Sequence, residues 1–169
     1  IMGKNIILIS IFFNILLCEW EIMSFPDTFV NGLTFNGNNI FVIVGEGEVH
    51  HSSDEGETWS FISQIPDILP YGADLFKQID SYLFFSQNIG GGSSNYRSYF
   101  NGDYWENWEE ILYQSSTITD IIHYNNEIYT ILNNEVVKSL DFGDSWDTIG
   151  NSPEDGYLNL LLVNSDYIY

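Results

Sequence analysis

Ser-Ser-Asp-Glu-Gly-Glu-Thr-Trp at residues 52–59 and Ser-Leu-Asp-Phe-Gly-Asp-Ser-Trp at residues 139–146 are two copies of one octapeptide, Ser-x-Asp-x-Gly-x-[Thr/Ser]-Trp. A third copy at residues 98–105 keeps the serine, the glycine and the tryptophan, but Phe100 stands in place of the aspartate and Tyr104 in place of the Thr or Ser. In chain order we call them box 1, box 2 and box 3. Their first serines are 46 and 41 residues apart, a spacing typical of small four-stranded sheets repeated around an axis.

A second pattern repeats with the same period. An apolar stretch, a short polar turn and a β-prone run precede each box, and this unit begins once more near the last residue. The paired segments are 33–35 with 40–44, 74–76 with 82–85, 121–123 with 128–132, and 160–163 with 167–169. Their second members begin 42, 46 and 39 residues apart. The two patterns together predict an all-β fold, a β-propeller with four-stranded antiparallel blades.

The repeats cover residues 28–169 and amount to three blades and the start of a fourth. Closed propellers have about four to eight blades, so we expect this array to be part of a larger one. Boxes 1 and 3 each follow one short β-prone run and precede another. This order predicts that the box lies on the hairpin between the third and fourth strands of its blade.

The residue types of the box suit a tight turn. Asp54 and Asp141 can accept backbone N–H groups within the turn, and Gly56 and Gly143 can take a positive φ. The tryptophans can pack between neighbouring strands, and Phe100 predicts that the turn of box 2 is held by packing. We therefore expect a structural role for thirteen box residues: Ser52, Asp54, Gly56, Thr58, Trp59, Ser98, Gly102, Trp105, Ser139, Asp141, Gly143, Ser145 and Trp146.

The octapeptide resembles the Asp-box, or BNR repeat, of sialidase-like β-propellers. It is similar to the repeats of sortilin receptors, xyloglucanase-type glycosidases and photosystem II assembly factors, so it identifies an architecture that unrelated activities share. The resemblance implies that the boxes lie at the periphery of the blades, away from the central mouth where ligands bind. It also implies that Asp54 and Asp141 are structural.

The N-terminal residues look like a secretory leader. Lys4 supplies a positive charge, residues 6–17 an apolar run, and Cys18 a small side chain before a cleavage point. The run is shorter than the roughly 20 residues that span a bilayer, although an uncleaved anchor through residues 6–18 stays open. Because Cys18 is the only cysteine, a chain cleaved after it has no disulfide. The predicted organisation, in a secreted or extracytoplasmic protein, is a leader at 1–18, a lead-in at 19–27 and the repeats at 28–169.

The formal net charge is −20. A field of this sign repels nucleic-acid phosphates and anionic lipid surfaces, so nucleic acid and membranes are excluded as partners of the folded domain. The acids can simply keep the outer surface solvated, or they can bind a cation or a basic partner. We predict no cofactor, and we expect a protein or a glycan as the ligand.

A sialidase is the sharpest catalytic hypothesis. The family resemblance implies three arginines for the substrate carboxylate, a tyrosine nucleophile activated by a glutamate, and an aspartate as acid and base. The chain has one arginine, Arg97, and residues 24–27 lack the arginine that the family has near its first blade. Arg97 directly precedes box 2, as His51 precedes box 1 and Lys138 precedes box 3, so we expect it on an outer strand.

We therefore predict a non-catalytic Asp-box propeller that serves as a binding scaffold at its mouth, with no catalytic residue assigned in this chain. The alternative is a sialidase-like glycoside hydrolase whose catalytic residues lie partly outside this sequence.

The remaining candidates for a site are weaker. Asp27, Asp74 and Asp120 come at the start of predicted inner strands, so they are the candidate acids for a central mouth. The three histidines, His50, His51 and His123, have no spacing suited to a metal, because neighbours on a strand point to opposite faces. We also expect a flexible loop at 88–95, and we expect Trp105 in the core with Trp108 free to stack on a sugar.

Overall fold

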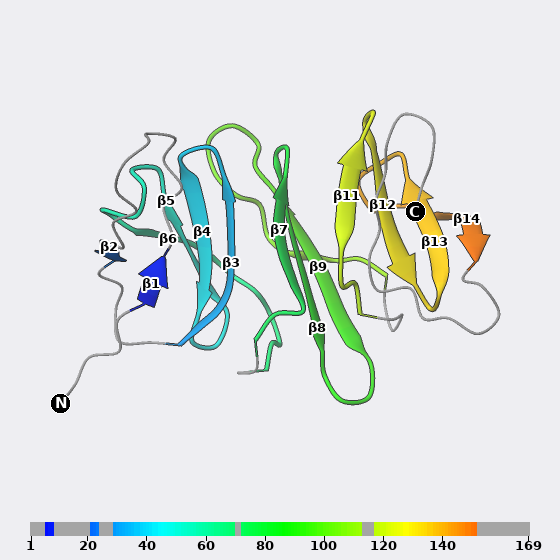
Figure 1. Ribbon diagram of the computed structural model, residues 1–169, viewed down its shortest axis with the longest axis horizontal. Helices are drawn as coiled ribbons and strands as arrows, with labels where there is room; N and C mark the ends of the chain where they lie inside the picture. Colours follow the sequence, from blue (N-terminus) through cyan, green and yellow to red (C-terminus); the bar gives the residue numbers. More distant parts are fainter. Residues whose placement is uncertain (1–5, 9–20, 24–28, 70–71, 113–116, 152–169) are drawn as a thin grey trace.

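The computed structural model describes residues 6–8, 21–23, 29–69, 72–112 and 117–151, and these contain strands and turns without any helix. Most strands belong to three four-stranded antiparallel sheets that follow one another along the chain (Figure 1). We call these sheets blade 1, blade 2 and blade 3. The predicted all-β fold with four-stranded antiparallel blades is confirmed.

Each blade is built in strict chain order, so neighbouring strands are joined by hairpins. Blade 1 comprises β3 (Val30–Asn36), β4 (Asn39–Val44), β5 (Glu48–Ser52) and β6 (Ser60–Gln64). Blade 2 comprises β7 (Leu75–Ile79), β8 (Tyr82–Asn88), β9 (Ser93–Tyr99) and β10 (Glu109–Glu110). Blade 3 comprises β11 (Ile121–Tyr124), β12 (Glu127–Leu132), β13 (Glu135–Ser139) and β14 (Asp147–Asn151). A separate pair, β1 (Ile6–Leu8) and β2 (Glu21–Met23), is antiparallel.

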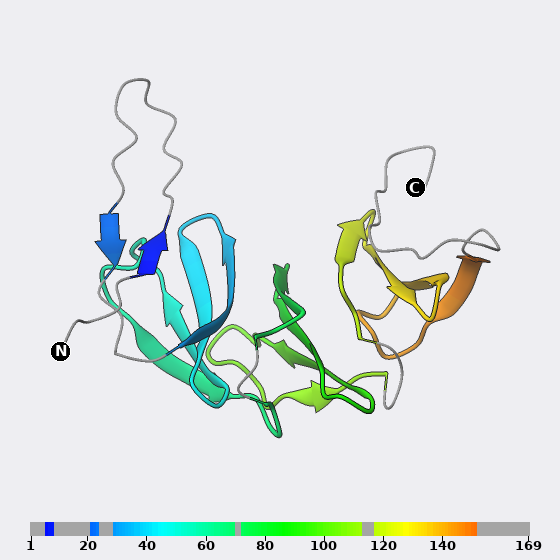
Figure 2. The ribbon, with the colours of Figure 1, turned by 60° about the horizontal axis from the view of Figure 1, so that its bottom comes forward.

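The blades stand side by side on an arc. Figure 2 shows the first strands, β3, β7 and β11, on the concave side of the arc and the last strands, β6, β10 and β14, toward the convex side. Boxes 1, 2 and 3 connect β5 to β6, β9 to β10 and β13 to β14. They therefore join the third and fourth strands of the blades, as the strand order in the sequence predicts.

The second strand of each blade is almost wholly buried, because other strands of the blade flank it and a neighbouring blade packs on its sheet. Every residue from Ile40 to Val44 in β4 is buried. Phe41 and Ile43 point to blade 2, whereas Ile40, Val42 and Val44 belong to a separate cluster on the opposite face. Such strands are continuous apolar runs instead of alternating ones, which is why residues 40–44, 82–85 and 128–132 stand out in the sequence.

Two apolar interfaces hold the three blades together. In seam 1/2, between blades 1 and 2, the buried side chains are Phe41, Ile43, Val49, Ile65, Phe76, Leu83, Phe85, Tyr96 and Trp108. In seam 2/3, between blades 2 and 3, they are Leu75, Ile79, Phe84, Ile111, Ile118, Ile121, Ile128, Leu132 and Val137. Each seam removes a large apolar area from water, and this is the main stabilising contribution in such an array.

The expectation that Trp108 is free to stack on a sugar is wrong. Its side chain is only 9% exposed and lies in seam 1/2, where the indole N–H donates a 3.1 Å hydrogen bond to Ser63 Oγ of blade 1. Trp105 is half-buried and packs against the same cluster. Among the aromatic side chains of residues 100–108, the exposed one is Tyr104, at 63%.

The predicted flexible loop at 88–95 is much shorter than expected. Ser93, Ser94 and Asn95 are buried within β9, so only residues 89–92 connect β8 to β9. Asn95 Oδ1 accepts hydrogen bonds from Ser86 Oγ at 2.6 Å and from the backbone N–H of Ile118 at 3.3 Å. This buried polar group ties the segment that enters blade 3 to blade 2.

Candidate functional site

Boxes 1 and 3 form the same turn with the same six hydrogen bonds. The aspartate accepts one from the serine hydroxyl, one from the backbone N–H of the Thr or Ser four residues after the aspartate, and one from the hydroxyl of that Thr or Ser. In box 1 these donors to Asp54 are Ser52 Oγ at 2.8 Å, Thr58 N at 2.9 Å and Thr58 Oγ1 at 2.6 Å. In box 3 the donors to Asp141 are Ser139 Oγ at 2.7 Å, Ser145 N at 2.9 Å and Ser145 Oγ at 2.6 Å.

The other three bonds of each turn use the serine oxygen and the glycine. Ser52 Oγ accepts from the N–H of Asp54 and of Gly56, and Ser139 Oγ accepts from the N–H of Asp141 and of Gly143. The indole N–H groups of Trp59 and Trp146 donate to the carbonyls of Gly56 and Gly143 at 3.0 and 3.1 Å. Gly56 and Gly143 have φ of 92° and 107°, which side chains with a Cβ rarely adopt.

These hydrogen bonds stabilise the charged form of both aspartates. Donation from Thr58 and Ser52 lowers the pKa of Asp54 from 3.8 to about 2. Donation from Ser139 and Ser145 holds the pKa of Asp141 well below its usual range. Both carboxylates are therefore acceptors within their own turns, and neither has the raised pKa that suits a general acid.

Box 2 is held in another way. Phe100 and Trp105 form an isolated antiparallel bridge with ring centroids 5.3 Å apart, which agrees with the expectation that packing replaces the aspartate. Asn101 Oδ1 accepts the backbone N–H groups of Asp103 and Tyr104 at 3.1 and 3.2 Å. Ser98 Oγ donates to the carbonyl of Glu106 at 2.6 Å, and Gly102 has a φ of 105°. Asn101 and Gly102 form a turn signal that the octapeptide pattern does not include.

Arg97 on β9 lies in seam 2/3 and is only 8% exposed. Its Nη1 donates to the backbone carbonyls of Phe142 at 2.7 Å and Asp141 at 3.2 Å, both in box 3. Its Nη2 donates to Glu109 Oε2 at 3.1 Å and to the carboxylate of Asp144. The guanidinium group is thus bound from two blades at once. The position on an outer strand confirms the expectation from the residue's place before box 2.

Aromatic rings complete this end of seam 2/3. The ring of Tyr82 stacks on that of Phe142, with centroids 4.7 Å apart and an interplanar angle of 13°. The Arg97 guanidinium lies 5.6 Å from the centroid of the Tyr82 ring, within the range of a cation–π contact. Burial raises the pKa of Tyr82, and the positive charge of Arg97 opposes this shift. Tyr82 is therefore a neutral wall of the site.

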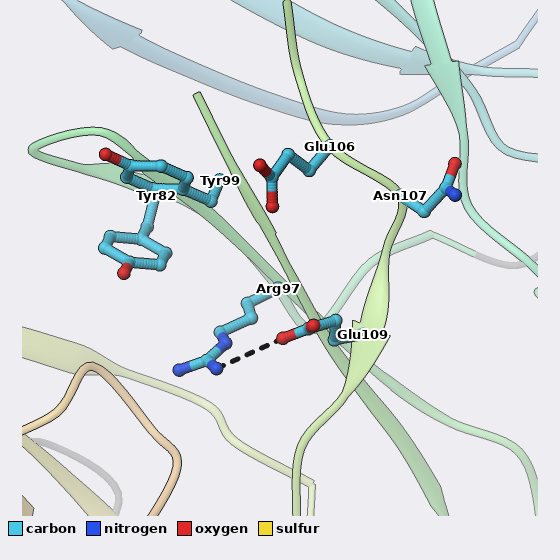
Figure 3. Close-up of a pocket in the computed structure, with 6 residues that line it drawn as sticks. All are labelled: Tyr82, Arg97, Tyr99, Glu106, Asn107 and Glu109. Carbon is cyan, nitrogen blue, oxygen red and sulfur yellow. Dashed lines mark hydrogen bonds and ion pairs between the residues drawn. The ribbon is translucent and has the colours of Figure 1, made fainter. Parts of the chain in front are cut away.

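A pocket of about 130 Å³ opens beside these residues, and we call it the seam pocket (Figure 3). It is lined by Tyr82, Arg97, Tyr99, Glu106, Asn107 and Glu109. Figure 3 shows the rings of Tyr82 and Tyr99 next to each other, with the Glu106 carboxylate and the Arg97–Glu109 pair around the same space. The two ring centroids are 4.9 Å apart, and Tyr99 is 38% exposed.

Of the three candidate acids of the central mouth, Asp120 and Asp74 accept hydrogen bonds from nearby groups. Asp120 Oδ1 accepts from Lys77 Nζ at 3.3 Å and from the N–H of Ile121 at 2.8 Å. Asp74 Oδ2 accepts from the N–H of Asn88 at 2.6 Å. Asp27 lies outside the described residues. No hydrogen bond or ion pair joins Asp74 to Asp120 in the described part of the chain, so they do not form a carboxylate pair there.

The other two residues that precede a box, His51 and Lys138, make contacts different from those of Arg97. His51 Nε2 lies 2.8 Å from Asn39 Oδ1, and its ring stacks on Phe41 at 4.6 Å. Burial lowers the pKa of His51. Lys138 Nζ lies 3.2 Å from Glu127 Oε1. Of the three residues that precede a box, Arg97 is the one that donates hydrogen bonds to the box of the following blade.

The histidines are separated as expected. His50 contacts Glu48 and the edge of Phe61, on the opposite face of β5 from His51, whereas His123 lies 3.5 Å from Asp80. The described ranges contain no group of three His, Cys, Asp or Glu side chains placed to bind a metal ion. Within the same ranges there is no helix with the length and apolarity needed to cross a membrane.

Comparison with known proteins supports the fold alone. No family model and no curated protein sequence matches this chain. Among solved structures it is similar to a chain of the nidogen/laminin complex, with 10% identity over 90% of this chain and 59% of that chain and a TM-score of 0.62. It is similar to the computationally designed Ika4 protein, with 11% identity over 86% of each chain and a TM-score of 0.51. A third similar structure is YCF48 bound to D1 peptide, with 19% identity over 78% of this chain and 43% of that chain and a TM-score of 0.49.

This chain therefore spans about half the length of the YCF48 and nidogen/laminin chains that it matches. Its three successive four-stranded sheets on an arc, together with these likenesses, show that it has a β-propeller fold.

Proposed function

We propose that this chain is an exported, non-catalytic propeller scaffold that binds a basic segment of another protein. The observation that carries the proposal is the seam pocket, where aromatic walls and carboxylates of blade 2 meet beside seam 2/3. This location differs from the central mouth that we expected from the sequence.

The chemistry of the seam pocket favours a cation. Among the described residues, no ion pair or side-chain hydrogen bond engages the Glu106 carboxylate. The positive charge of Arg97 is already shared between Glu109 and Asp144, so it does not neutralise Glu106. Tyrosine faces next to a free carboxylate suit a lysine or arginine side chain, through cation–π contact on one side and ion pairing on the other.

The size of the pocket favours a side chain over a free small molecule. A volume of about 130 Å³ is well below the roughly 300–1,000 Å³ of pockets that enclose whole ligands. It has room for the end of one long side chain whose backbone stays outside. The net charge of −20 adds a long-range attraction that raises the association rate for a basic partner.

Binding of a fluorescent lysine- and arginine-rich peptide to the full chain tests the proposal by anisotropy. We expect saturable binding that weakens as salt rises from 50 to about 500 mM, because screening shortens the reach of the charges. Glu106→Gln should weaken binding by up to about fivefold, the range of an exposed ion pair. Glu46→Gln is the matched control, since Glu46 is an exposed acid in the β4–β5 connection. Equal affinities for the two variants would contradict the site.

Two further measurements separate the other candidate functions. Binding of neutral oligosaccharides with no binding of the basic peptide would favour a glycan ligand instead. Turnover of a fluorogenic sialoside would support the glycoside hydrolase, which needs arginines free to hold a carboxylate. In this chain Arg97 is engaged by four acceptors.

Export is tested separately. We expect the chain, expressed with residues 1–18 in a secreting host, to appear outside the cytoplasm with a new N-terminus at residue 19. Mass spectrometry of the mature protein measures this end directly, and an intact leader on a membrane-bound product would favour the anchor.

A further inference from the structure

Box 1 and box 3 have the same backbone but different surroundings. Glu55 and Phe142 occupy the same place in the two turns, with φ of 61° and 55°, and the glycines that follow have φ of 92° and 107°. The six internal hydrogen bonds also correspond one to one. The backbone carbonyls of box 1 therefore stand at the same positions in the turn as those of box 3.

Box 3 does bind a ligand group, the guanidinium of Arg97. Three acceptors of the turn meet it: the carbonyl of Asp141, the carbonyl of Phe142 and the carboxylate of Asp144. Arg97 comes from the preceding blade, 44 to 47 residues earlier, so this contact is not part of the turn's own folding. It shows directly how a guanidinium docks on this octapeptide.

Box 1 presents three acceptors at the same positions, and one of them, the carbonyl of Asp54, also accepts the backbone N–H of Glu57 at 3.3 Å. They are the carbonyls of Asp54 and Glu55 and the carboxylate of Glu57, which stands where box 3 has Asp144. Glu55 adds a second carboxylate in place of Phe142, and both glutamates are exposed. Among the described residues the cationic side chains of Lys77, Arg97 and Lys138 are paired with other acids. Within the described ranges, no lysine or arginine side chain is therefore paired with the acids of box 1.

We infer that box 1 is an arginine-binding site, and that its ligand is an arginine side chain on polypeptide outside these 169 residues. The ligand comes from elsewhere because Arg97 is the single arginine of the sequence and is engaged in seam 2/3. A guanidinium fits better than an ammonium, because its planar fork can donate to two adjacent carbonyls and a carboxylate together. This site is separate from the seam pocket and does not depend on it.

The indole N–H of Trp59 provides a reporter, since it donates to the Gly56 carbonyl inside the turn. Its resonance in a ¹⁵N-labelled full chain can be followed while N-acetyl-arginine methylamide is added to tens of millimolar, with the lysine analogue at equal ionic strength as the control. We expect a saturable shift at Trp59 with the arginine compound only. Trp146 should not respond, because Arg97 already fills its turn.

Two variants sharpen the test. Arg97→Ala empties the equivalent site of box 3, so Trp146 should become responsive to the arginine compound. Glu57→Gln should weaken the response of Trp59 by up to about fivefold, whereas Glu46→Gln and Glu106→Gln should leave it unchanged. If Arg97→Ala does not fold, the comparison of the glutamate variants still decides the question.

No saturable shift at Trp59, or equal shifts with the arginine and lysine compounds, would overturn the inference. A shift that Glu57→Gln leaves unchanged would overturn it as well. The Glu106→Gln result keeps this outcome distinct from a failure of the seam pocket to bind a basic peptide.

Discussion

Arg97 in blade 2 donates a 2.7 Å hydrogen bond to the backbone carbonyl of Phe142 in blade 3. Phe142 has a positive φ and its ring stacks on Tyr82 of blade 2. The turn of box 3 is thus supported from inside by its own aspartate and from outside by the preceding blade. Arg97 alone donates these hydrogen bonds from blade 2 to box 3, so substitution of this one side chain measures how much they stabilise seam 2/3.

Replacing Arg97 should destabilise seam 2/3. Arg97→Ala leaves the acceptors of box 3 and Glu109 without their donor, and we expect a loss of about 1.5–3 kcal/mol, the range for hydrogen bonds to a charged group. Arg97→Lys should recover only part of it, because one ammonium cannot reach all four acceptors. Urea unfolding followed by tryptophan fluorescence gives the free energies. Full recovery by lysine would show that charge alone matters.

Removing the box serine should cost stability in each blade independently. Ser52 and Ser139 are 1% and 2% exposed and accept the N–H of a buried glycine. Ser52→Ala and Ser139→Ala should each destabilise by about 1–3 kcal/mol through the unsatisfied group. The effects should add, since the two turns share no hydrogen-bond partner.

The neighbouring Ser53 is exposed, so Ser53→Ala is the control and should change the free energy of unfolding by less than about 0.5 kcal/mol. A loss from Ser53→Ala as large as that from Ser52→Ala would mean that burial of the hydroxyl is not the cause.

Acid should weaken the box turns in a defined pH window. The pKa of Asp54 is lowered from 3.8 to about 2 in the folded chain, so its contribution is fully present above about pH 4 and is lost as the pH falls through about 2. Asp54→Asn should remove this part of the pH dependence. The difference between the wild-type and variant urea midpoints at pH 5 and pH 2.5 measures it, and an unchanged difference would contradict the role of Asp54.

Two glycines in the β4–β5 connection make a matched pair. A Cβ on Gly47, at φ 106°, would lie 2.8 Å from Ile68 Cδ1, whereas a Cβ on Gly45, at φ 52°, would meet nothing within 4 Å. Gly45→Ala should cost about 1–2 kcal/mol for the left-handed backbone alone. Gly47→Ala adds overpacking of about 1–3 kcal/mol. Thermal unfolding should rank them in this order, and equal melting temperatures would show that Ile68 moves freely.

The strand order and the box turns could be predicted from the sequence because their causes are local. The six hydrogen bonds of box 1 join residues at most four positions apart, so the octapeptide carries its own conformation. The apolar runs at 40–44 and 128–132 reveal strands covered on both faces. The repeat spacing then determines how many such units there are.

The seam contacts could not be predicted, because they join residues about one blade apart. Trp108 meets Ser63 across 45 positions, and Arg97 meets Asp144 across 47. Nothing in the neighbourhood of Trp108 tells a buried indole from an exposed one, and this is why its prediction was wrong. The place of Arg97 before box 2 indicated an outer strand but not its acceptors.

The sequence by itself therefore determined the blades, since each depends on continuous apolar runs and on turn hydrogen bonds within a few residues. Only the tertiary structure decided how the blades meet, and with it the seam pocket, the burial of Trp108 and the contact of Arg97 with the turn of box 3. The physical reason is that packing and ion pairing act over a few ångströms in space, whatever the separation along the chain.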